Sequence, residues 1–382
     1  MSAEDPLTNR KAWLCSLLLL LCLSAWSWLR QPTVTPTPVE AQSDQLVFED
    51  VTLDQPNERG ERLWKLRAVQ ATYSPSGSQA KVDKPRGKLF RGEQELYEIE
   101  ANEGEVNQDG ETIVLRGKVF VQDLRDGAAL RADEAEWLPN EDSLTLRGQV
   151  VGTQEGLQIR ASEGIWQDSS NEIRLTGTPV LTTVKEQRLT VETEAALWQI
   201  GQQRISSEKA IALRQSAEAD PETIVRRANA GNGELNLETQ DVILRQNAIV
   251  TFVEPPMDIR SNNLRWQTQR DQVTSEARVT VVDRAEKVTM AGDRADADIA
   301  NEVVEFTGNV RGVAELRQSR ITADRLKWFA KTQDVEAEGN VNYAQVEPSL
   351  EVSGPSATGN LNDEFVTMSG GEVQTTVIPI TE

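Results

Sequence analysis

Residues 159–166 read Ile159-Arg160-Ala161-Ser162-Glu163-Gly164-Ile165-Trp166, and variants of this short motif recur along most of the chain. In each copy an apolar anchor is followed by a small residue two positions on and by a large residue, often Trp, five positions after that. The anchors, at intervals of about 31 residues, are Leu66, Ile99, Leu130, Ile159, Val191, Ala228, Ile259, Met290, Ile321 and Val352. A fixed period of this length predicts a stacked array of repeats rather than a compact enzyme domain.

Each copy of the motif has the pattern of a bent β-hairpin. Ile159 and Ala161 share one parity along the chain, whereas Gly164 and Trp166 share the other. Because the two pairs have opposite parity, one side of the strand can stay buried along all four residues only if a bulge or corner separates the pairs. A polar turn follows, and then a second strand of the type Leu144, Leu146, Gly148, Val150, in which the glycine favours a bend.

The sequence therefore predicts an all-β fold, an array of about ten bent-hairpin repeats. No repeat can bury its apolar face alone, so we expect two facing sheets with a continuous apolar slot between them. The tryptophans fit this slot, but taken on their own they favour a plain packed core. The acidic residues beside the anchors, Asp133, Glu163, Asp293 and Asp324, are expected to be solvated.

Composition limits the function classes. Forty Lys and Arg against 61 Asp and Glu give a net charge of −21, which disfavours nucleic acid as a partner. The chain has no His, and its two cysteines, Cys15 and Cys22, both lie in the N-terminal apolar run. No phosphate loop, zinc-ligand spacing or nucleophile elbow is present in the sequence. We therefore expect no enzyme activity, no catalytic residues, no metal and no cofactor.

The N-terminus has the pattern of a membrane anchor. Residues 12–29 form an apolar run with basic residues on both sides and tryptophans near its ends, long enough for one transmembrane helix. A cleaved signal peptide and a lipoprotein at Cys22 are the alternatives. We expect a cytoplasmic segment at 1–11, the helix at 12–29 and a Pro/Thr-rich linker at 30–43 that lifts the folded part off the membrane.

The segment after the linker resembles the LptC family, the bitopic periplasmic components of lipopolysaccharide export. The resemblance is carried by Leu46-Val47-Phe48-Glu49-Asp50-Val51-Thr52-Leu53, by Leu63-Trp64-Lys65-Leu66-Arg67-Ala68 and by Ala71-Thr72-Tyr73. The downstream copies, such as 159–166 with Leu175-Thr176-Gly177, are similar to the LptA/OstA-type jelly-roll repeat. We expect LptC-like repeats at 44–225 and LptA/OstA-like repeats at 226–382, continuing one array that is longer than a familiar LptC.

The resemblance implies an elongated V-shaped β-jelly roll that transports lipid without catalysis. Such a protein is anchored in the inner membrane by a single pass, with its large C-terminal domain in the periplasm. It accepts lipopolysaccharide or a related glycolipid from an ABC transporter of the LptB/LptF/LptG type. It passes the lipid on, joined edge to edge to an LptA-like bridge or an outer-membrane LptD-type protein.

Two sets of residues are predicted to carry this function. The lipid-groove candidates are Leu66, Ile99, Leu130, Trp137, Ile159, Trp166, Val191, Trp198, Ile259, Trp266, Met290, Ile321 and Trp328. The docking-edge candidates are Val47, Val51 and Leu53 at one end of the array and Val366 and Val373 at the other. The alternative functions are a membrane-anchored structural or adhesive β-repeat stalk, which binds no lipid, and a polysaccharide-processing β-solenoid, for which no clustered carboxylates are seen.

Overall fold

The structure is a computed structural model that describes residues 46–56, 60, 62–107, 111–183, 188–347, 349–361, 365–371 and 373–377. The predicted cytoplasmic segment, transmembrane helix and linker at 1–43 lie outside the described residues. Within the described part, no helix has the length and apolarity that a membrane span requires.

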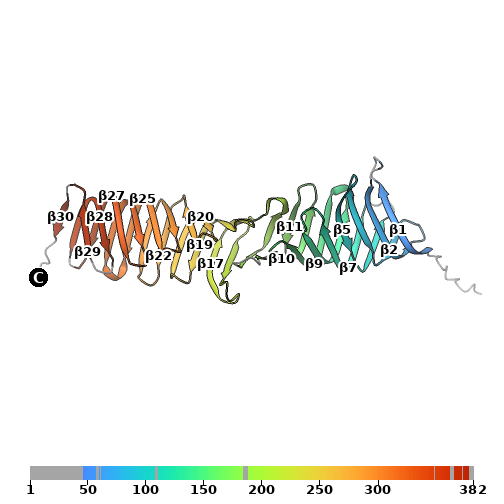
Figure 1. Ribbon diagram of the computed structural model, residues 1–382, viewed down its shortest axis with the longest axis horizontal. Helices are drawn as coiled ribbons and strands as arrows, with labels where there is room; N and C mark the ends of the chain where they lie inside the picture. Colours follow the sequence, from blue (N-terminus) through green and yellow to red (C-terminus); the bar gives the residue numbers. More distant parts are fainter. Residues whose placement is uncertain are drawn as a thin grey trace, which may run out of the picture. The chain divides into compact units, whose positions relative to one another are not determined.

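The described chain is all-β, as predicted, and its only helical elements are three 3-10 turns (Figure 1). These turns are η1 (Pro139–Glu141), η2 (Ile200–Gln202) and η3 (Glu315–Arg317). The strands are β1 (Leu46–Pro56), β2 (Arg62–Tyr73), β3 (Gln79–Asp83), β4 (Arg86–Arg91), β5 (Gln94–Glu100), β6 (Glu103–Asn107), β7 (Ile113–Asp123), β8 (Ala129–Leu138), β9 (Ser143–Gln154), β10 (Leu157–Gln167), β11 (Glu172–Thr176), β12 (Val180–Thr183), β13 (Leu189–Thr193), β14 (Ala195–Gln199), β15 (Arg204–Ser207), β16 (Ile211–Ser216), β17 (Ile224–Ala230), β18 (Asn232–Asn236), β19 (Asp241–Phe252), β20 (Met257–Gln267), β21 (Gln272–Ser275), β22 (Val279–Asp283), β23 (Val288–Gly292), β24 (Arg294–Asp298), β25 (Val303–Ala314), β26 (Ser319–Phe329), β27 (Asp334–Gln345), β28 (Leu350–Asn360), β29 (Phe365–Ser369) and β30 (Gln374–Val377).

The long strands bend in the middle, and their two halves belong to two layers. In β10, Leu157–Arg160 pairs with β12 whereas Glu163–Gln167 pairs with β11, and the register with β9 shifts between Ala161 and Glu163. This shift lies where the parity of the apolar pattern slips in the sequence. The predicted corner is therefore confirmed, and it recurs in β8, β20, β26 and β28.

The first layer is defined by one unbroken line of paired residues that contains every anchor. Strand by strand the line reads Leu53, Leu66, Gly87, Ile99, Val121, Leu130, Gly152, Ile159, Leu181, Val191, Leu213, Ala228, Val250, Ile259, Val281, Met290, Gly312, Ile321, Tyr343, Val352 and Thr375. Directly paired residues point to the same face of a sheet. The anchors that repeat with the sequence period therefore all lie on one face of the first layer.

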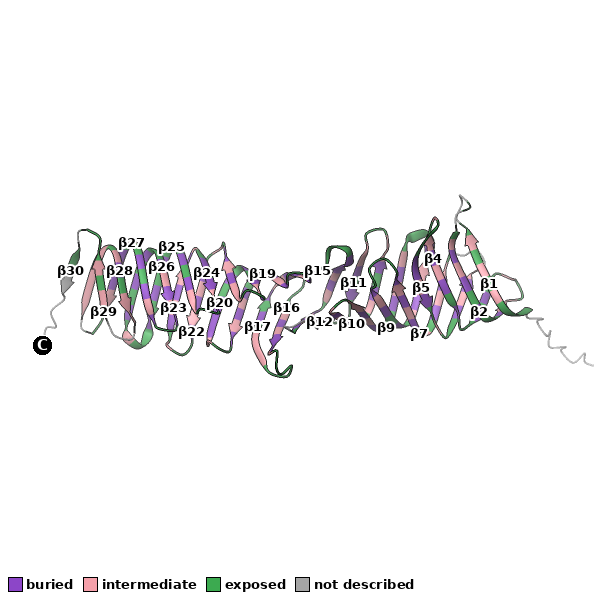
Figure 2. Ribbon diagram, in the orientation of Figure 1, coloured by how far each residue is buried: buried purple, intermediate pink, exposed green. Residues whose placement is uncertain are grey.

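The second layer has a matching line that contains the motif tryptophans. It reads Leu46, Tyr73, Ala80, Val106, Ile113, Trp137, Leu144, Trp166, Ile173, Trp198, Ile205, Leu235, Val242, Trp266, Val273, Ala297, Val304, Trp328, Val335, Gly359 and Val366. Both lines are almost entirely apolar. Along most strands buried positions alternate with half-buried or exposed ones, because only one face of each layer is covered (Figure 2).

Several corners are built by glycines in the left-handed region. Gly148, Gly308 and Gly339 have φ of +72°, +80° and +78°, each followed by a residue that also has positive φ. Side chains of the adjoining strand cover them, since a Cβ on Gly339 would lie 2.4 Å from Asp324 Oδ2. The solvated acids Asp293 and Asp324 accept hydrogen bonds from Asn309 and Asn340 at these corners.

The widest interval in the repeat does not interrupt the array. Val191 and Ala228 are 37 residues apart in the sequence, yet both pair directly with Leu213. The extra residues form the loop at 217–223 between β16 and β17. Strand pairing therefore continues through the region where the interval changes.

Candidate functional site

The face between the layers is the candidate site, and the predicted groove residues converge on it. Twelve of them are buried, at 8% exposure or less, within one apolar cluster that runs through the described array. Trp137 is the exception, since it is half-buried and packs against the margin of this cluster. The motif side chains therefore lie between the layers rather than toward solvent, and their role in lining a lipid groove stays a prediction.

Side chains of the two layers meet across this space. The rings of Tyr97 and Trp166 are in edge-to-face contact with centroids 4.8 Å apart, and those of Phe252 and Trp266 are 6.4 Å apart. A Cβ on Gly152 of the first layer would lie 3.2 Å from the ring of Trp198 of the second. Side chains of the two layers thus fill the space between them, ring against ring in two of these contacts and ring against glycine in the third.

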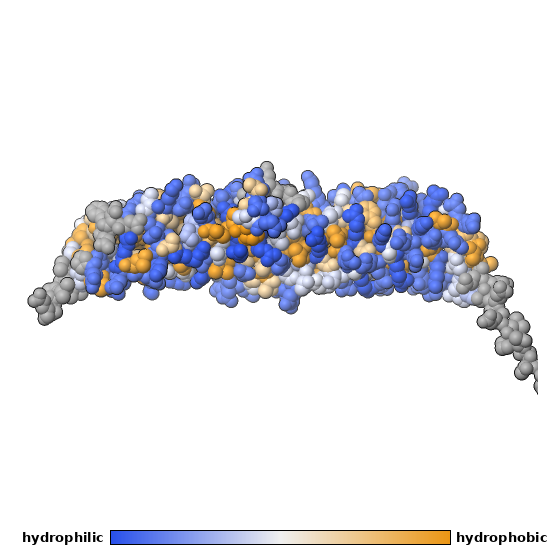
Figure 3. All heavy atoms as spheres, turned by 90° about the horizontal axis from the view of Figure 1, so that it is seen from below, coloured by the Kyte–Doolittle hydropathy of each residue, from blue (hydrophilic) through white to orange (hydrophobic). Residues whose placement is uncertain are grey.

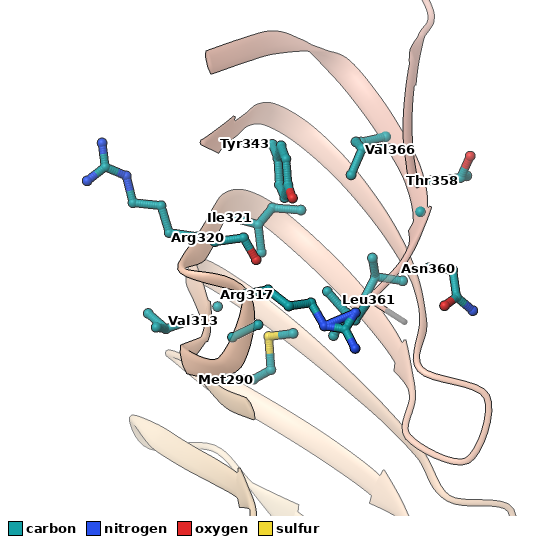
Figure 4. Close-up of a pocket in the computed structure, with 16 residues that line it drawn as sticks. Met290, Val313, Arg317, Arg320, Ile321, Tyr343, Thr358, Asn360, Leu361 and Val366 are labelled. Atoms are coloured by element: carbon teal, nitrogen blue, oxygen red, sulfur yellow. The ribbon is translucent and has the colours of Figure 1, made fainter. Parts of the chain in front are cut away.

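The predicted continuous slot is for the most part filled by protein side chains, and apolar space remains at two places. One space lies under Leu181, Val191, Ile205 and Leu235. The other is lined by Met290, Ile321, Tyr343 and Val366 (Figure 4). The Arg317 side chain extends into the second space toward Leu361. Both spaces lie between the layers, so the interior is an apolar core with room at these two positions.

The side of the interior opposite the corners is closed by polar contacts, and we call it the seam. Here the turns that follow second-layer strands meet strand ends and turns of the first layer. Asp168, in the turn after β10, accepts hydrogen bonds from Tyr97 and Arg91 and lies 3.0 Å from Arg125. Arg125 also pairs at 2.5 Å with Asp123, which is fully buried. The result is a polar cluster that joins the two layers.

Burial and charge set the titration of this cluster. The pKa of Tyr97 is raised above its usual value, first because burial disfavours the phenolate and then because its hydroxyl is bonded to Asp168. The hydrogen bond with Asp123 raises the pKa of Arg125. Tyr97 therefore remains a neutral donor and Arg125 a cation throughout the neutral range.

Two further contacts close the seam along the array. Arg226 of β17 forms an ion pair at 2.7 Å with Asp271 in the turn after β20. Gln333, after β26, donates a hydrogen bond of 3.3 Å to the buried carboxylate of Asp283. Sequence patterns do not reveal these residues, because they come from irregular turns and join positions tens of residues apart, with no period to mark them.

The docking-edge candidates occupy the two ends of the described array. The side chains of Leu46, Val47 and Phe48 on β1 are 61%, 51% and 49% exposed. Val51 and Leu53 point inward and pack on the core instead. At the other end, Val366 of β29 lines the second apolar space and Val373, just before β30, is exposed. In the described residues, β1, β29 and β30 each pair with one strand only.

The face of the array seen in Figure 3 is mostly hydrophilic, with patches of apolar residues among the hydrophilic ones. Many charges are paired between neighbouring strands, for example Lys88 with Glu95 and Lys327 with Glu305. No group of three or more His, Cys, Asp or Glu that could hold a metal ion occurs among the described residues. Charged residues therefore distinguish this surface from the apolar interior.

Fold and site together define a class: β-jelly-roll proteins in which two layers of bent strands enclose an apolar interior. A family model described as lipopolysaccharide-assembly, LptC-related, matches residues 16–158 and 217–315, most of the chain. The chain belongs to this LptC-related family, which confirms the resemblance found in the sequence and gives the chain a role in lipopolysaccharide transport.

Similarity to individual proteins is weaker than similarity to the family. No curated protein matches the chain. Among solved structures, the chain is similar to the crystal structure of LptH, the LptA-homologous periplasmic component of the lipopolysaccharide transport device of Pseudomonas aeruginosa. That similarity has 13% identity and a TM-score of 0.28, and it covers 32% of this chain and 83% of LptH. A TM-score this low supports no inference about this chain.

Proposed function

We propose that this protein is a non-catalytic carrier that holds the acyl chains of lipopolysaccharide, or of a related glycolipid, between its two layers. One observation carries the proposal: two facing lines of almost entirely apolar residues extend through the described array, one from β1 to β30 and the other from β1 to β29. Burying an acyl chain there stabilises the complex by about 0.8 kcal/mol per methylene. Such an interior holds a lipid without a basic patch, in keeping with the acidic surface.

The other parts of the proposal concern the membrane and the partners. Residues 12–29 would anchor the chain in the inner membrane, with the described array in the periplasm as a V-shaped jelly roll. Repeats 44–225 would receive lipid from an ABC transporter of the LptB/LptF/LptG type, and repeats 226–382 would pass it toward the outer membrane. The exposed edge of β1 supports docking at the transporter end, because unpaired strand edges accept a further strand.

The end formed by β29 and β30 is the corresponding edge for an LptA-like bridge or an LptD-type protein. Both strands have one paired side in the described structure. Strand addition there would extend both layers, so the apolar lines of the two proteins would be joined. The apolar space beside Val366 would then lie next to the junction.

A packed interior favours a second candidate, a structural stalk. Trp198, Trp266 and Trp328 are fully buried, and little space remains between the layers around them. A stalk requires such a core and binds no lipid. The two candidates differ in whether the layers separate to admit a ligand.

Site-specific photo-crosslinking in cells distinguishes the two candidates. Ile159 faces the interior and the adjacent Arg160 faces solvent on the same strand, so the pair is a matched test. A photoreactive residue at 159 should capture lipopolysaccharide, and one at 160 should not. Equal capture at both positions, or no capture at either, would count against the carrier proposal and favour the stalk.

A further inference from the structure

The buried tryptophans share an unusual property. The indole nitrogens of Trp64, Trp166, Trp198, Trp266 and Trp328 have no hydrogen-bond partner among the described residues. Each of these side chains is at most 3% exposed. Buried polar groups are normally paired, so a repeated unpaired donor of one chemical type calls for an explanation.

These indoles lie at the seam rather than at the corners. Four of the five belong to the second-layer line: Trp166, Trp198, Trp266 and Trp328. Each is the next-to-last residue of its strand and lies just before the turn that reaches the seam. Trp64 lies in the first layer, paired with Leu89, which pairs in turn with Tyr97 of the seam cluster. The tryptophans with unpaired donors therefore stand near one margin of the apolar interior, four of them on the second layer and Trp64 on the first.

Other polar groups gather at the same margin. Buried polar residues end or adjoin the first-layer strands at the seam: Asp123, Thr183, Gln215, Asp283 and Ser319. In the second-layer turns, Asn171 Oδ1, Gln240 Nε2 and Gln333 Oε1 are further buried atoms with no hydrogen-bond partner in the described structure. The anchor line, deeper between the layers, is almost entirely apolar. The interior is therefore apolar around the anchor line and polar where it borders the seam.

We propose that the seam recognises the carbonyl oxygens by which acyl chains are linked to the rest of the ligand, with the indole N–H groups as donors. An indole nitrogen can only donate, so the ligand atom that satisfies it must be an acceptor. A hydrocarbon chain has no acceptor, whereas an ester or amide carbonyl has one at the end of the chain. With the chain between the layers and the headgroup outside, that carbonyl lies at the seam.

This proposal deepens the proposed function and rests on it. It assigns a specificity role to these tryptophans: acyl esters and amides would bind better than alkyl chains of equal length. It also explains why Trp, rather than Phe or Leu, stands at these positions. Packing alone requires a large apolar ring and makes no use of an N–H group.

The test uses the full-length chain in a maltoside detergent and two phosphatidylglycerols with chains of equal length, one ester-linked and one ether-linked. Displacement of a fluorescent fatty acid measures binding, and ¹⁵N-labelled indoles report hydrogen bonding by NMR. The ester lipid should bind about fivefold more tightly for each hydrogen bond formed. Only this lipid should shift the indole resonances of Trp198 and Trp328 in the direction of a stronger hydrogen bond.

Benzothienylalanine keeps the shape of Trp but has no N–H, so it separates hydrogen bonding from packing. Introduced at Trp198 or Trp328, it should reduce the ester preference and leave binding of the ether lipid unchanged. Introduced at Trp137, which lies in the same line but is half-buried, it should leave the preference intact. Equal binding of both lipids to the unmodified chain, with unmoved indole resonances, would overturn this inference and leave the carrier function standing. If neither lipid binds, this inference is overturned as well, and the crosslinking at position 159 decides the carrier function separately.

Discussion

Arg226 and Asp271 form an ion pair across the seam, with Arg226 Nη1 2.7 Å from Asp271 Oδ1. Arg226 belongs to the first layer and Asp271 to a turn of the second, so the pair holds together the side on which a ligand would enter. The guanidinium is 15% exposed and also lies over the ring of Phe252. A partly buried ion pair is weak support for stability but is costly to break on one side.

Asp271→Asn should loosen the seam. The asparagine keeps the left-handed backbone at φ +51° but leaves the Arg226 charge without its partner carboxylate. We expect a loss of about 1–3 kcal/mol in the free energy of unfolding, together with a higher crosslinking yield at interior positions. The control is Asp241→Asn, which breaks the ion pair of Asp241 with Arg265 between neighbouring strands of one layer. If both variants change interior crosslinking equally, the seam has no special role.

Alkaline pH should weaken the seam at Tyr97. The folded-state pKa of this phenol is raised by burial and by Asp168, so the native state keeps its proton when the unfolded chain loses it. The stability that this shift contributes is fully present below the usual tyrosine pKa of about 10 and is lost as pH rises above it. Tyr97→Phe should flatten the fall in unfolding midpoint between about pH 10 and 11.5. An unchanged slope in that variant would assign the alkaline loss to other groups.

The corner glycines should tolerate alanine poorly. Gly339→Ala adds a Cβ at 2.4 Å from Asp324 Oδ2 to a backbone with φ +78°. The strain in the left-handed region, about 1–2 kcal/mol, and the overpacking, about 1–3 kcal/mol, should both appear in chemical unfolding. Gly127 has φ +72° but open space, with no atom within 4 Å of where a Cβ would lie, so Gly127→Ala isolates the backbone strain. Equal losses in the two variants would show that the neighbouring aspartate yields freely.

Docking of the transporter at the exposed edge of β1 should depend on backbone hydrogen bonds more than on side chains. Val47→Pro removes a backbone donor and should abolish pull-down of the transporter, while Val47→Thr keeps the donor and the shape and should preserve it. Hydrogen exchange in β20 to β28 should be unchanged in both variants, because those strands do not contact β1. Loss of pull-down in both variants would point to a side-chain contact instead, and retention in both would exclude docking at this residue.

Much of the architecture could be predicted from the sequence because the repeat is local. Anchor, small residue and Trp stand at fixed separations, and alternation fixes which of them share a face. This placed Ile159 and Trp166 in the interior and put a corner between them. Partner strands were not predictable from the pattern, but a regular period leaves few pairings that keep all the anchors on one face.

The candidate site was only partly predictable. The sequence predicted the apolar residues between the layers but not the polar contacts of the seam, where Asp168 contacts residues 43 to 77 positions away in the chain. The sequence also did not predict how far side chains fill the space between the layers. That depends on which residues face each other across it, for example the ring of Trp198 on one layer and Gly152 on the other.

The sequence by itself determined the β class, the bent repeat and the inward face, because period-two alternation and a fixed repeat length act within neighbouring strands. The tertiary structure alone decided which residues oppose one another across the interior and which polar groups close it. Those contacts join turns remote in sequence, and their geometry follows from the twist and stacking of the two layers rather than from any local pattern.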